Sequence, residues 1–250
     1  MSERHPLGSL GESSLTDSEE RRVGVPKQEA ILTSRLVSDA GALFPPGPGR
    51  SSWLILEPQT GFGVPDALLI RASPTAVRAH QGRGLRVPTL SAAQVLTAGS
   101  KEVPTLTRRH AQSLRLDLTR SGWTALAARR AAGVVTDSLS IEVKLQDARR
   151  ALQQLSKFRL STHSAAVCMP ESTAHRVSRT TLARFGAGLL VAEDRAIRWD
   201  VEPVRRELPT FRRLWLAELL LRALEDGSAY RFSAPRKRSI ADSSARTLPR

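Results

Sequence analysis

The amino-acid sequence predicts an α/β protein, α+β in the arrangement of its elements, with a central mixed β-sheet flanked by helices. Two observations indicate this fold class. Short apolar runs of strand length alternate with longer stretches whose apolar residues recur every three or four positions, as in amphipathic helices. The chain has 250 residues, 40% of them hydrophobic, which is enough for one large domain or two small ones.

Charge and cysteine content narrow the class of function. The chain carries 38 Lys and Arg against 24 Asp and Glu, a net charge of +14, which favours a polyanionic partner such as nucleic acid. Its one cysteine, Cys168, excludes an internal disulfide framework, and its five histidines lack metal-ligand spacing. There is no apolar run of about 18 residues. We therefore expect a cytoplasmic protein without a membrane partner.

The first part of the chain predicts a helix followed by two strands. Residues 1–25 are rich in Ser, Gly and charge, and we expect them to be disordered. PKQEAILTSRLVSDAGALF then has a helical apolar face closed by PPGPG. SSWLILEP and PDALLI are predicted strands joined by the turn GFG, with Pro65 at a strand start, where no ladder donor is needed.

Residues 72–123 differ from the flanking sequence in composition and pattern, and this difference predicts an inserted module. Three short helical patterns precede a Gly-Trp turn into chain expected to be extended, which resembles a winged helix-turn-helix. Between Arg71 and Arg130, Lys and Arg outnumber acids by nine. A small helical bundle with a solvated arginine face is the alternative. The candidate nucleic-acid contacts are Arg83, Arg86, Arg108, Arg109, Arg115 and Arg120.

The remaining chain predicts alternating strands and helices. TALAARRAAGVV and LSIEVKL are expected to be two strands joined by the turn TDS, followed by a helix over residues 147–160 and the strand SAAVCMP. A helix, the strand AGLLVAE and an edge strand IRWDVEP come next. The apolar helix LPTFRRLWLAELLLRAL should pack on the sheet and is also a candidate homodimer interface. Residues 231–250 are predicted to be a basic, disordered tail.

An acid and a lysine share one face of the LSIEVKL strand. Side chains alternate along a strand, so Glu142 and Lys144 lie on the face opposite Ile141 and Val143. Such a pair is costly on a buried face unless it binds a cation, a ligand or each other. The alternative is an exposed pair on an edge strand.

Together with its neighbours, this pair resembles the PD-(D/E)xK nuclease superfamily, which has the restriction-endonuclease-like fold. Pro65 and Asp66 supply the PD, Glu142 and Lys144 supply the ExK, and Gln154 with Phe158 loosely resembles the QxxxY motif with Phe in place of Tyr. The nuclease-like core would comprise residues 26–71 and 124–230. The insertion at 72–123 would account for the 76 positions between the aspartate and the glutamate.

The resemblance implies Mg²⁺-dependent hydrolysis of DNA phosphodiesters, with Mn²⁺ as an alternative ion and the basic module binding DNA. Asp66 and Glu142 would be metal ligands together with the carbonyl of Val143. Lys144 would be the catalytic lysine, and Gln154 would orient the substrate or that lysine. Glu29 and Glu57 are auxiliary acids at most, and surface roles are preferred for both.

Asp137 competes with Asp66 for the role of the family's aspartate. It lies five residues before Glu142 in the predicted turn. If Asp137 is the ligand, the preceding predicted strand offers only Ala131 and Ala132 at the expected place, and the alternative function is a non-catalytic DNA-binding or regulatory protein on a decayed nuclease fold. The enzyme interpretation requires Asp66 to lie beside the Glu142 strand, with the two carboxyl groups about 4 to 6 Å apart around one cation.

Overall fold

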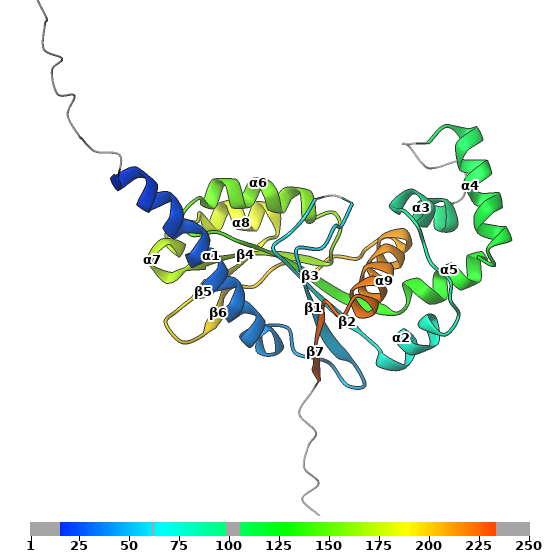
Figure 1. The fold of residues 1–250 in the computed structure, drawn as a ribbon, viewed down its shortest axis with the longest axis horizontal. Coiled ribbons are helices and arrows are strands. Elements are labelled where there is room, and N and C mark those ends of the chain that lie inside the picture. Colours follow the sequence, from blue (N-terminus) through cyan, green and yellow to red (C-terminus); the bar gives the residue numbers. More distant parts are fainter. Residues whose placement is uncertain (1–15, 62, 99–105, 234–250) are drawn as a thin grey trace, which may run out of the picture.

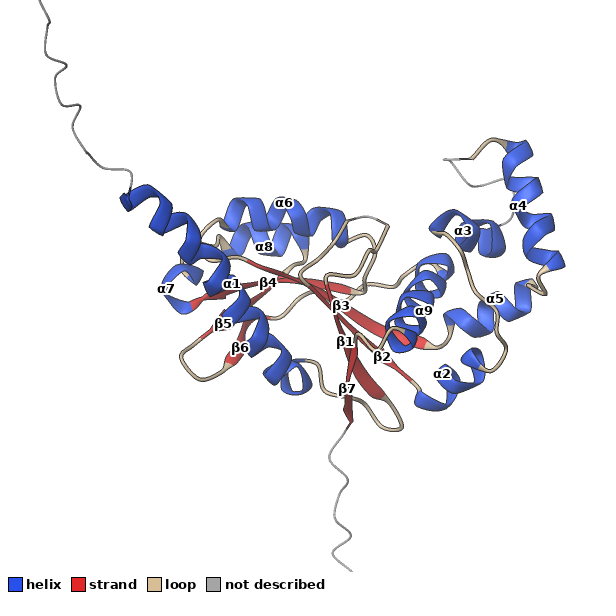
Figure 2. Cartoon of the chain, viewed as in Figure 1, coloured by secondary structure: helices blue, strands red, loops and turns tan. Residues whose placement is uncertain are grey.

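The structure, a computed structural model, describes residues 16–61, 63–98 and 106–233. A seven-stranded mixed sheet forms its centre, in the order β6-β5-β4-β3-β2-β1-β7, and helices cover both faces (Figures 1 and 2). The strands are β1 (Ser51–Leu56), β2 (Ala67–Ala72), β3 (Val135–Val143), β4 (Ser164–Pro170), β5 (Gly188–Ala192), β6 (Ile197–Val201) and β7 (Ala229–Ser233). The helices are α1 (Thr16–Leu43), α2 (Pro74–Gln81), α3 (Leu90–Ala98), α4 (Arg108–Arg120), α5 (Ala125–Ala132), α6 (Ala148–Phe158), α7 (Glu171–Ala174), α8 (Arg179–Phe185) and α9 (Thr210–Glu225). The predicted α/β class with a mixed sheet is confirmed.

Strand direction changes at the middle of the sheet. β1, β2 and β3 pair antiparallel, β3 and β4 pair parallel through the crossover helix α6, and β4 and β5 are again parallel. β6 pairs antiparallel with β5 at one edge, as predicted for IRWDVEP. At the other edge β7 pairs antiparallel with β1. β3 is therefore the strand at which the antiparallel half meets the parallel half.

Helix α1 covers one face of the sheet. Leu36 and Ala40 on α1 are fully buried and pack in one cluster with Leu54, Leu69 and Ile141. Consecutive residues of a strand point to opposite faces of the sheet, as expected: on β4, Ala166 faces α1 and Val167 faces the side that carries α6 and α8. Ile31 of α1 is also apolar, but its side chain is exposed to solvent.

The opposite face is covered in two separate parts. α6 and α8 pack on β4 and β5 through an apolar cluster that includes Leu155, Val167 and Leu182. α9 packs on β1 and β2 through a second cluster that includes Leu68 and Leu220. The two clusters do not merge, because the side chains of β3 on this face are polar.

Helices α2 to α5 extend the α9 cluster rather than forming a core of their own. Val95 of α3, Leu118 of α4 and Ala128 of α5 are buried in the same cluster as Trp53 and Leu68 of the sheet. The three predicted helices of residues 72–123 are therefore present. No strand follows them directly, because residues 125–132 form α5 instead of the extended chain that a winged helix-turn-helix requires.

The strand prediction for TALAARRAAGVV was wrong. Thr124 caps α5 by accepting a hydrogen bond from the Ala127 N–H, Gly133 follows its last residue, and Ala128 and Ala131 form its buried face. Consequently TDS is not a turn: it lies inside β3, which begins at Val135.

Both predicted tails are shorter in the structure than in the sequence prediction. α1 begins at Thr16, so residues 16–25 of the expected disordered segment are helical. Residues 231–233 of the expected basic tail belong to β7, which was not predicted. The remaining parts of these two predictions, 1–15 and 234–250, lie outside the described residues. None of the helices in the described part of the chain combines the length and the apolar character needed to cross a membrane.

Candidate active site

A row of buried polar side chains on β3 leads to the site. Ser138, Ser140 and Glu142 point to the face that carries α6 and α9, while Leu139 and Ile141 point to α1. Each polar side chain of the row has a partner: Ser138 bonds to His163 at 2.8 Å and Ser140 to Thr162 at 3.0 Å. We call Ser138, Ser140 and Glu142 the polar row. Glu142, which is only 1% exposed, is thus the last member of a buried row of polar side chains in the middle of the sheet.

Asp66 lies directly beside Glu142. Ala67 pairs with Ile141 in the antiparallel ladder. Asp66, directly before Ala67, therefore lies opposite Glu142, directly after Ile141. One carboxylate oxygen of Asp66, Oδ2, accepts a hydrogen bond of 2.6 Å from the Val143 N–H. Asp66 is one-third exposed, whereas the Glu142 side chain is almost inaccessible.

Lys144 joins the two carboxylates. Its Nζ lies 2.8 Å from Glu142 Oε1 and 3.6 Å from Asp66 Oδ2, and it donates a 2.9 Å hydrogen bond to the Val143 carbonyl. Two carboxylate oxygens contributed by segments 76 positions apart therefore surround one ammonium group. The sequence prediction that these three residues converge agrees with this arrangement.

Burial and mutual charge shift the proton equilibria of the pair. Burial raises the pKa of Glu142; the hydrogen bond from Lys144 opposes this rise, and the negative charges of Asp66 and Glu29 add to it. Burial alone would lower the pKa of Lys144, but the hydrogen bond to Glu142 and the charges of Glu142, Asp66 and Glu29 outweigh it, so that pKa is raised. Lys144 is therefore a stable ammonium at neutral pH, suited to binding negative charge.

One buried oxygen of the site has no partner. Glu142 Oε2 is inaccessible and accepts no hydrogen bond from residues 16–61, 63–98 or 106–233. A buried carboxylate oxygen without a partner is expensive unless it binds a cation or a proton. Across the same residues, no three His, Cys, Asp or Glu side chains are grouped as a metal site. The available oxygen donors are thus two carboxylates and the Val143 carbonyl.

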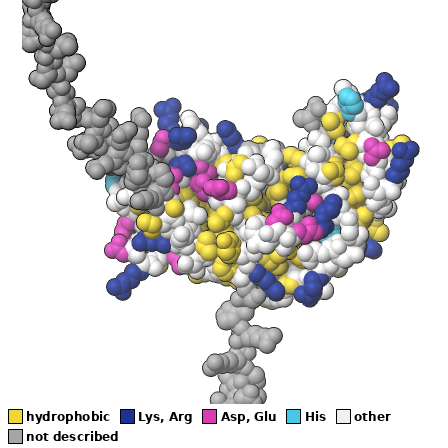
Figure 3. Space-filling view, viewed as in Figure 1, with side chains coloured by type: hydrophobic (Ala, Val, Ile, Leu, Met, Phe, Trp, Pro, Cys, Tyr) yellow, Lys and Arg dark blue, Asp and Glu magenta, His cyan; other side chains and the backbone are white. Residues whose placement is uncertain are grey.

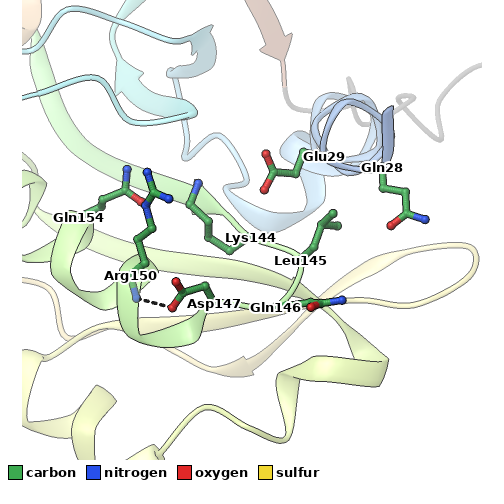
Figure 4. Close-up of a pocket in the computed structure, with 8 residues that line it drawn as sticks. All are labelled: Gln28, Glu29, Lys144, Leu145, Gln146, Asp147, Arg150 and Gln154. Carbon is green, nitrogen blue, oxygen red and sulfur yellow. Dashed lines mark hydrogen bonds between the residues drawn. The ribbon is translucent and has the colours of Figure 1, made fainter. Parts of the chain in front are cut away.

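A cavity of about 400 Å³ opens beside Lys144. Arg150 and Gln154 reach toward the lysine from α6, and Glu29 points toward it from α1 (Figure 4). Asp147 caps α6 by accepting a 2.8 Å hydrogen bond from the Arg150 N–H. The Oε1 atom of Gln154 is buried and has no hydrogen-bond partner within the described residues. This amide oxygen of Gln154 is therefore available to accept a hydrogen bond from a ligand in the cavity.

Two acids for which surface roles were preferred, Glu29 and Glu57, also line cavities at the site. Glu29 lines the cavity of Lys144 and a neighbouring cavity of about 440 Å³, which Glu57 and Asp66 also line. Glu57 has a positive φ of 46°, and its N–H donates to the Asp66 carbonyl, so the backbone is bent sharply next to the aspartate. Neither position can be predicted from local sequence, because the packing angle of α1 and the path of the β1–β2 connection decide where Glu29 and Glu57 lie.

Phe158 has a structural role. It is 3% exposed, and a Cβ placed on Gly63 would lie 2.5 Å from its ring. Gly63 has φ +137°, a conformation that favours glycine. The aromatic position of the predicted QxxxY-like motif therefore holds the connection before Asp66 against α6, while Gln154, one turn earlier, faces the cavity.

Asp137 does not take part in the site. It binds Arg71 at 3.0 Å and Arg205 at 3.5 Å, near the start of β3. Five residues of strand separate it from Glu142, a distance of about 17 Å. The structure therefore places Asp66, and not Asp137, beside the Glu142–Lys144 pair.

The predicted arginine contacts of residues 72–123 differ in their surroundings. Arg86 forms an ion pair with Glu225 of α9 and its carbonyl accepts a bond from the Trp123 indole, so it has a structural role. Arg120 lies 3.7 Å from Asp117 on the exposed side of α4. The other four predicted contacts are exposed at the surface: Arg83, Arg108, Arg109 and Arg115.

Comparisons with known proteins add little to this geometry. No protein-family model matches the chain, and no curated protein matches it. Among solved structures, the SPO1766 protein of unknown function from Silicibacter pomeroyi aligns with 36% of this chain and 64% of its own length, at 17% identity and a TM-score of 0.27. A likeness at that level carries no argument about fold or function.

Proposed function

We propose that the protein hydrolyses phosphodiester bonds of DNA with the help of Mg²⁺, in the manner of the PD-(D/E)xK nucleases that it resembles. The observation that carries the proposal is the convergence of Asp66 and Glu142 on Lys144 at the edge of a cavity. The buried oxygen of Glu142 that has no partner in the described part of the chain supports a cation at this place.

The order of the elements supports the same proposal. Helix α1 precedes β1, β2 begins directly after Pro65 and Asp66, β3 ends with Glu142 and Val143, and α6 leads to the parallel strand β4. This is the order of helix, PD strand, ExK strand, Gln-bearing helix and strand on which the resemblance was based. The insertion at 72–123 leaves this order intact, because its helices pack outward on α9.

The donor set fits a hard divalent ion. Carboxylate and carbonyl oxygens are the ligands that Mg²⁺ and Mn²⁺ prefer, and Asp66, Glu142 and the Val143 carbonyl supply them. When bound, Mg²⁺ polarises a phosphate oxygen and makes water easier to ionise. Its positive charge would also favour the ionised form of Glu142, whose pKa burial raises.

The other residues of the cavity would act on the substrate directly. The Lys144 ammonium is positioned to bind the negative charge that develops on the phosphorus-bound oxygens during attack. Arg150 adds a second positive charge on the same side of the cavity. The Gln154 Oε1 atom, buried and without a partner in the described residues, is positioned to accept a hydrogen bond from the attacking water or from the ammonium group.

The proposal is tested with supercoiled plasmid and Mg²⁺. The wild-type chain should nick or cut the plasmid, and Lys144→Ala should lower the rate by at least about 10²-fold, the usual cost of removing a group that stabilises transition-state charge. Lys157→Ala serves as the matched control, because Lys157 is an exposed lysine on α6. Equal cutting by Lys144→Ala and Lys157→Ala would rule out the assigned site.

One observation favours a second candidate function, DNA binding without catalysis. The predicted donors include only two carboxylates, and the ammonium of Lys144 already pairs with Glu142. In such a site the positive charge of Lys144 would compensate the negative charge of Glu142 without a metal ion. Plasmid that stays intact with every divalent ion, but is bound by both wild type and Lys144→Ala, would support this second candidate.

A further inference from the structure

The connection between β1 and β2 carries Asp66 and is held from outside by a helix far away in sequence. Residues 57–66 form this connection, and all of them except residue 62 are described. The indole Nε1–H of Trp215, on α9, donates a 2.7 Å hydrogen bond to the carbonyl of Thr60, 155 positions away in the chain. The position of the connection therefore depends on α9 as well as on the two strands that it joins.

The hydrogen bond from Trp215 acts on a closed turn. Thr60 is fully buried, and its N–H and its Oγ1 both donate to the carbonyl of Gly63, at 3.1 and 2.8 Å. Gly63 in turn lies against the ring of Phe158 on α6. The turn just before Asp66 is thus fixed by both α9 and α6, which restricts where the carboxylate of that residue can lie.

Trp215 is itself fixed by neighbouring side chains. It is buried, and the guanidinium carbon of Arg222 lies 5.3 Å from the centre of its ring. Arg222 pairs with Glu218 at 3.0 Å and donates to the Val87 carbonyl at 2.9 Å, while Glu218 accepts a 3.0 Å hydrogen bond from the Val87 N–H. Figure 3 shows charged side chains of both signs next to one another on the surface over α9. One helix therefore contacts both the connection before Asp66 and the segment between α2 and α3.

The insertion also contacts the connection directly. A Cβ placed on Gly61 would lie 3.4 Å from the side chain of Leu90, the first residue of α3, and 3.7 Å from the indole nitrogen of Trp215. Gly61 has φ +81°, a conformation that favours glycine, so this close approach uses a backbone that other residues rarely adopt. The insertion and α9 thus pack against the same short segment.

We infer that Trp215 is a positioning residue for Asp66. Its hydrogen bond fixes the turn that precedes the aspartate, so that Asp66 Oδ2 stays on the Val143 N–H and 3.6 Å from the Lys144 ammonium. The inference rests on the proposed function, in which Asp66 is a metal ligand. A ligand that is held in place before the metal arrives binds it more tightly than a mobile one, because less conformational freedom is lost on binding.

Amide hydrogen exchange followed by NMR tests the inference without metal, nucleic acid or catalysis. Trp215→Phe keeps an aromatic ring and removes the N–H. The Val143 amide, which is bonded to the Asp66 carboxylate, should exchange roughly fivefold faster, the effect of one lost hydrogen bond on a local opening. The Lys144 amide, which is bonded to the Cys168 carbonyl of β4, should keep its exchange rate. The ratio of the two rates separates a loosened aspartate from a general loss of stability.

Trp199→Phe is the matched control. Trp199 Nε1 donates a 3.2 Å hydrogen bond to the Leu43 carbonyl, so the same substitution removes the same kind of bond away from the connection. Isothermal titration with Mn²⁺ gives a second readout. The affinity should fall about tenfold in Trp215→Phe, the lower end of the range for groups that hold a metal ligand in place, and stay at the wild-type value in Trp199→Phe. If Trp215→Phe does not fold, Thr60→Val, which removes the Oγ1 bond inside the turn, should accelerate exchange of the Val143 amide in the same way.

The outcomes separate this inference from the proposed function. The positioning role is overturned if the two amides accelerate equally, or if Trp215→Phe and Trp199→Phe behave alike, even when the wild-type chain cuts plasmid. Faster exchange at Val143 with an unchanged Mn²⁺ affinity would also count against it, because the hydrogen bond would then not position Asp66 for a metal ion. If the wild-type chain neither binds Mn²⁺ nor cuts plasmid, but the Val143 amide alone accelerates in Trp215→Phe, the hydrolytic assignment fails and the role of Trp215 in holding Asp66 stands.

Discussion

At the scale of single residues, Glu142 determines how the site responds to pH. Its carboxyl group is buried, paired with Lys144 on one oxygen and without a partner in the described residues on the other. Burial favours the protonated form, so the folded protein binds a proton at this position more readily than the unfolded chain does. The site is thus less stable where Glu142 is ionised, the form that binds a cation.

This imbalance predicts that Glu142→Gln stabilises the metal-free protein while abolishing cutting. Because the folded-state pKa is raised, the stability contributed by the protonated form is present below the ordinary value of 4.5 and is lost as pH rises through the folded pKa. The gain in unfolding free energy of Glu142→Gln over wild type should therefore grow as pH increases. Urea titrations from pH 4 to 8 measure it.

The control for this prediction is Glu202→Gln, which makes the same substitution at an exposed position. Parallel pH profiles for wild type and Glu142→Gln would show that the buried carboxylate is not destabilising. Activity lost with unchanged stability would instead indicate that the pair with Lys144 balances the cost of burial.

The sequence indicated that Glu142 and Lys144 share a face because strand alternation is a local rule, whereas Asp66 was assigned from the resemblance to the PD motif. The period of two puts Glu142 and Lys144 on one face whatever the rest of the molecule does. Glu29 was assigned to the surface, although it lines the cavity. Its position depends on how α1 crosses the sheet, which is decided by packing between distant segments such as Leu36 and Ile141.

At the scale of elements, the exposed arginines of α4 make a separate prediction. Arg108→Ala combined with Arg109→Ala should flatten the salt dependence of duplex binding, because each phosphate contact contributes about 0.9 to the slope. Arg184→Ala with Arg195→Ala removes the same charge from exposed positions on α8 and the β5–β6 connection. Identical slopes for the two double variants would mean that α4 does not contact the nucleic acid.

The strand predicted after Trp123 was wrong although that segment carries helix signals. The segment after Trp123 begins with Thr124, ends before Gly133 and is rich in Ala and Arg, all favourable for a helix. The strand β7 was missed for a different reason: Ala229–Ser233 is short and gains its structure by pairing with β1, a partner far away in sequence. Propensity could have found α5, whereas β7 depends on tertiary contact.

At the scale of the whole molecule, the insertion and the sheet share one hydrophobic cluster, and we expect them to unfold as one unit. Leu118 of α4 is buried in the same cluster as Leu68 and Trp53. Leu118→Ala should therefore lower the stability of the entire described fold by about 2 to 5 kcal/mol, and calorimetry should show one transition that moves as a whole. Leu116→Ala, on the exposed side of the same helix, should have little effect.

Two separate transitions, with only one shifted by Leu118→Ala, would show that residues 72–132 fold independently. The sequence predicted a separate module over residues 72–123, since the composition changes at both ends of that segment. Composition does not reveal that α3 (Leu90–Ala98) and α5 (Ala125–Ala132) pack on α9, which begins only at Thr210. The shared cluster became visible only in the structure.

The place of β7 in the sheet has a consequence for synthesis of the protein. β1, which leads into the connection before Asp66, has β2 on one side and obtains its other neighbour only when residues 229–233 have left the ribosome. Until then its main-chain groups on that side are open to pairing with another nascent chain. Translation must therefore proceed past the last described residue before the hairpin carrying the aspartate is enclosed.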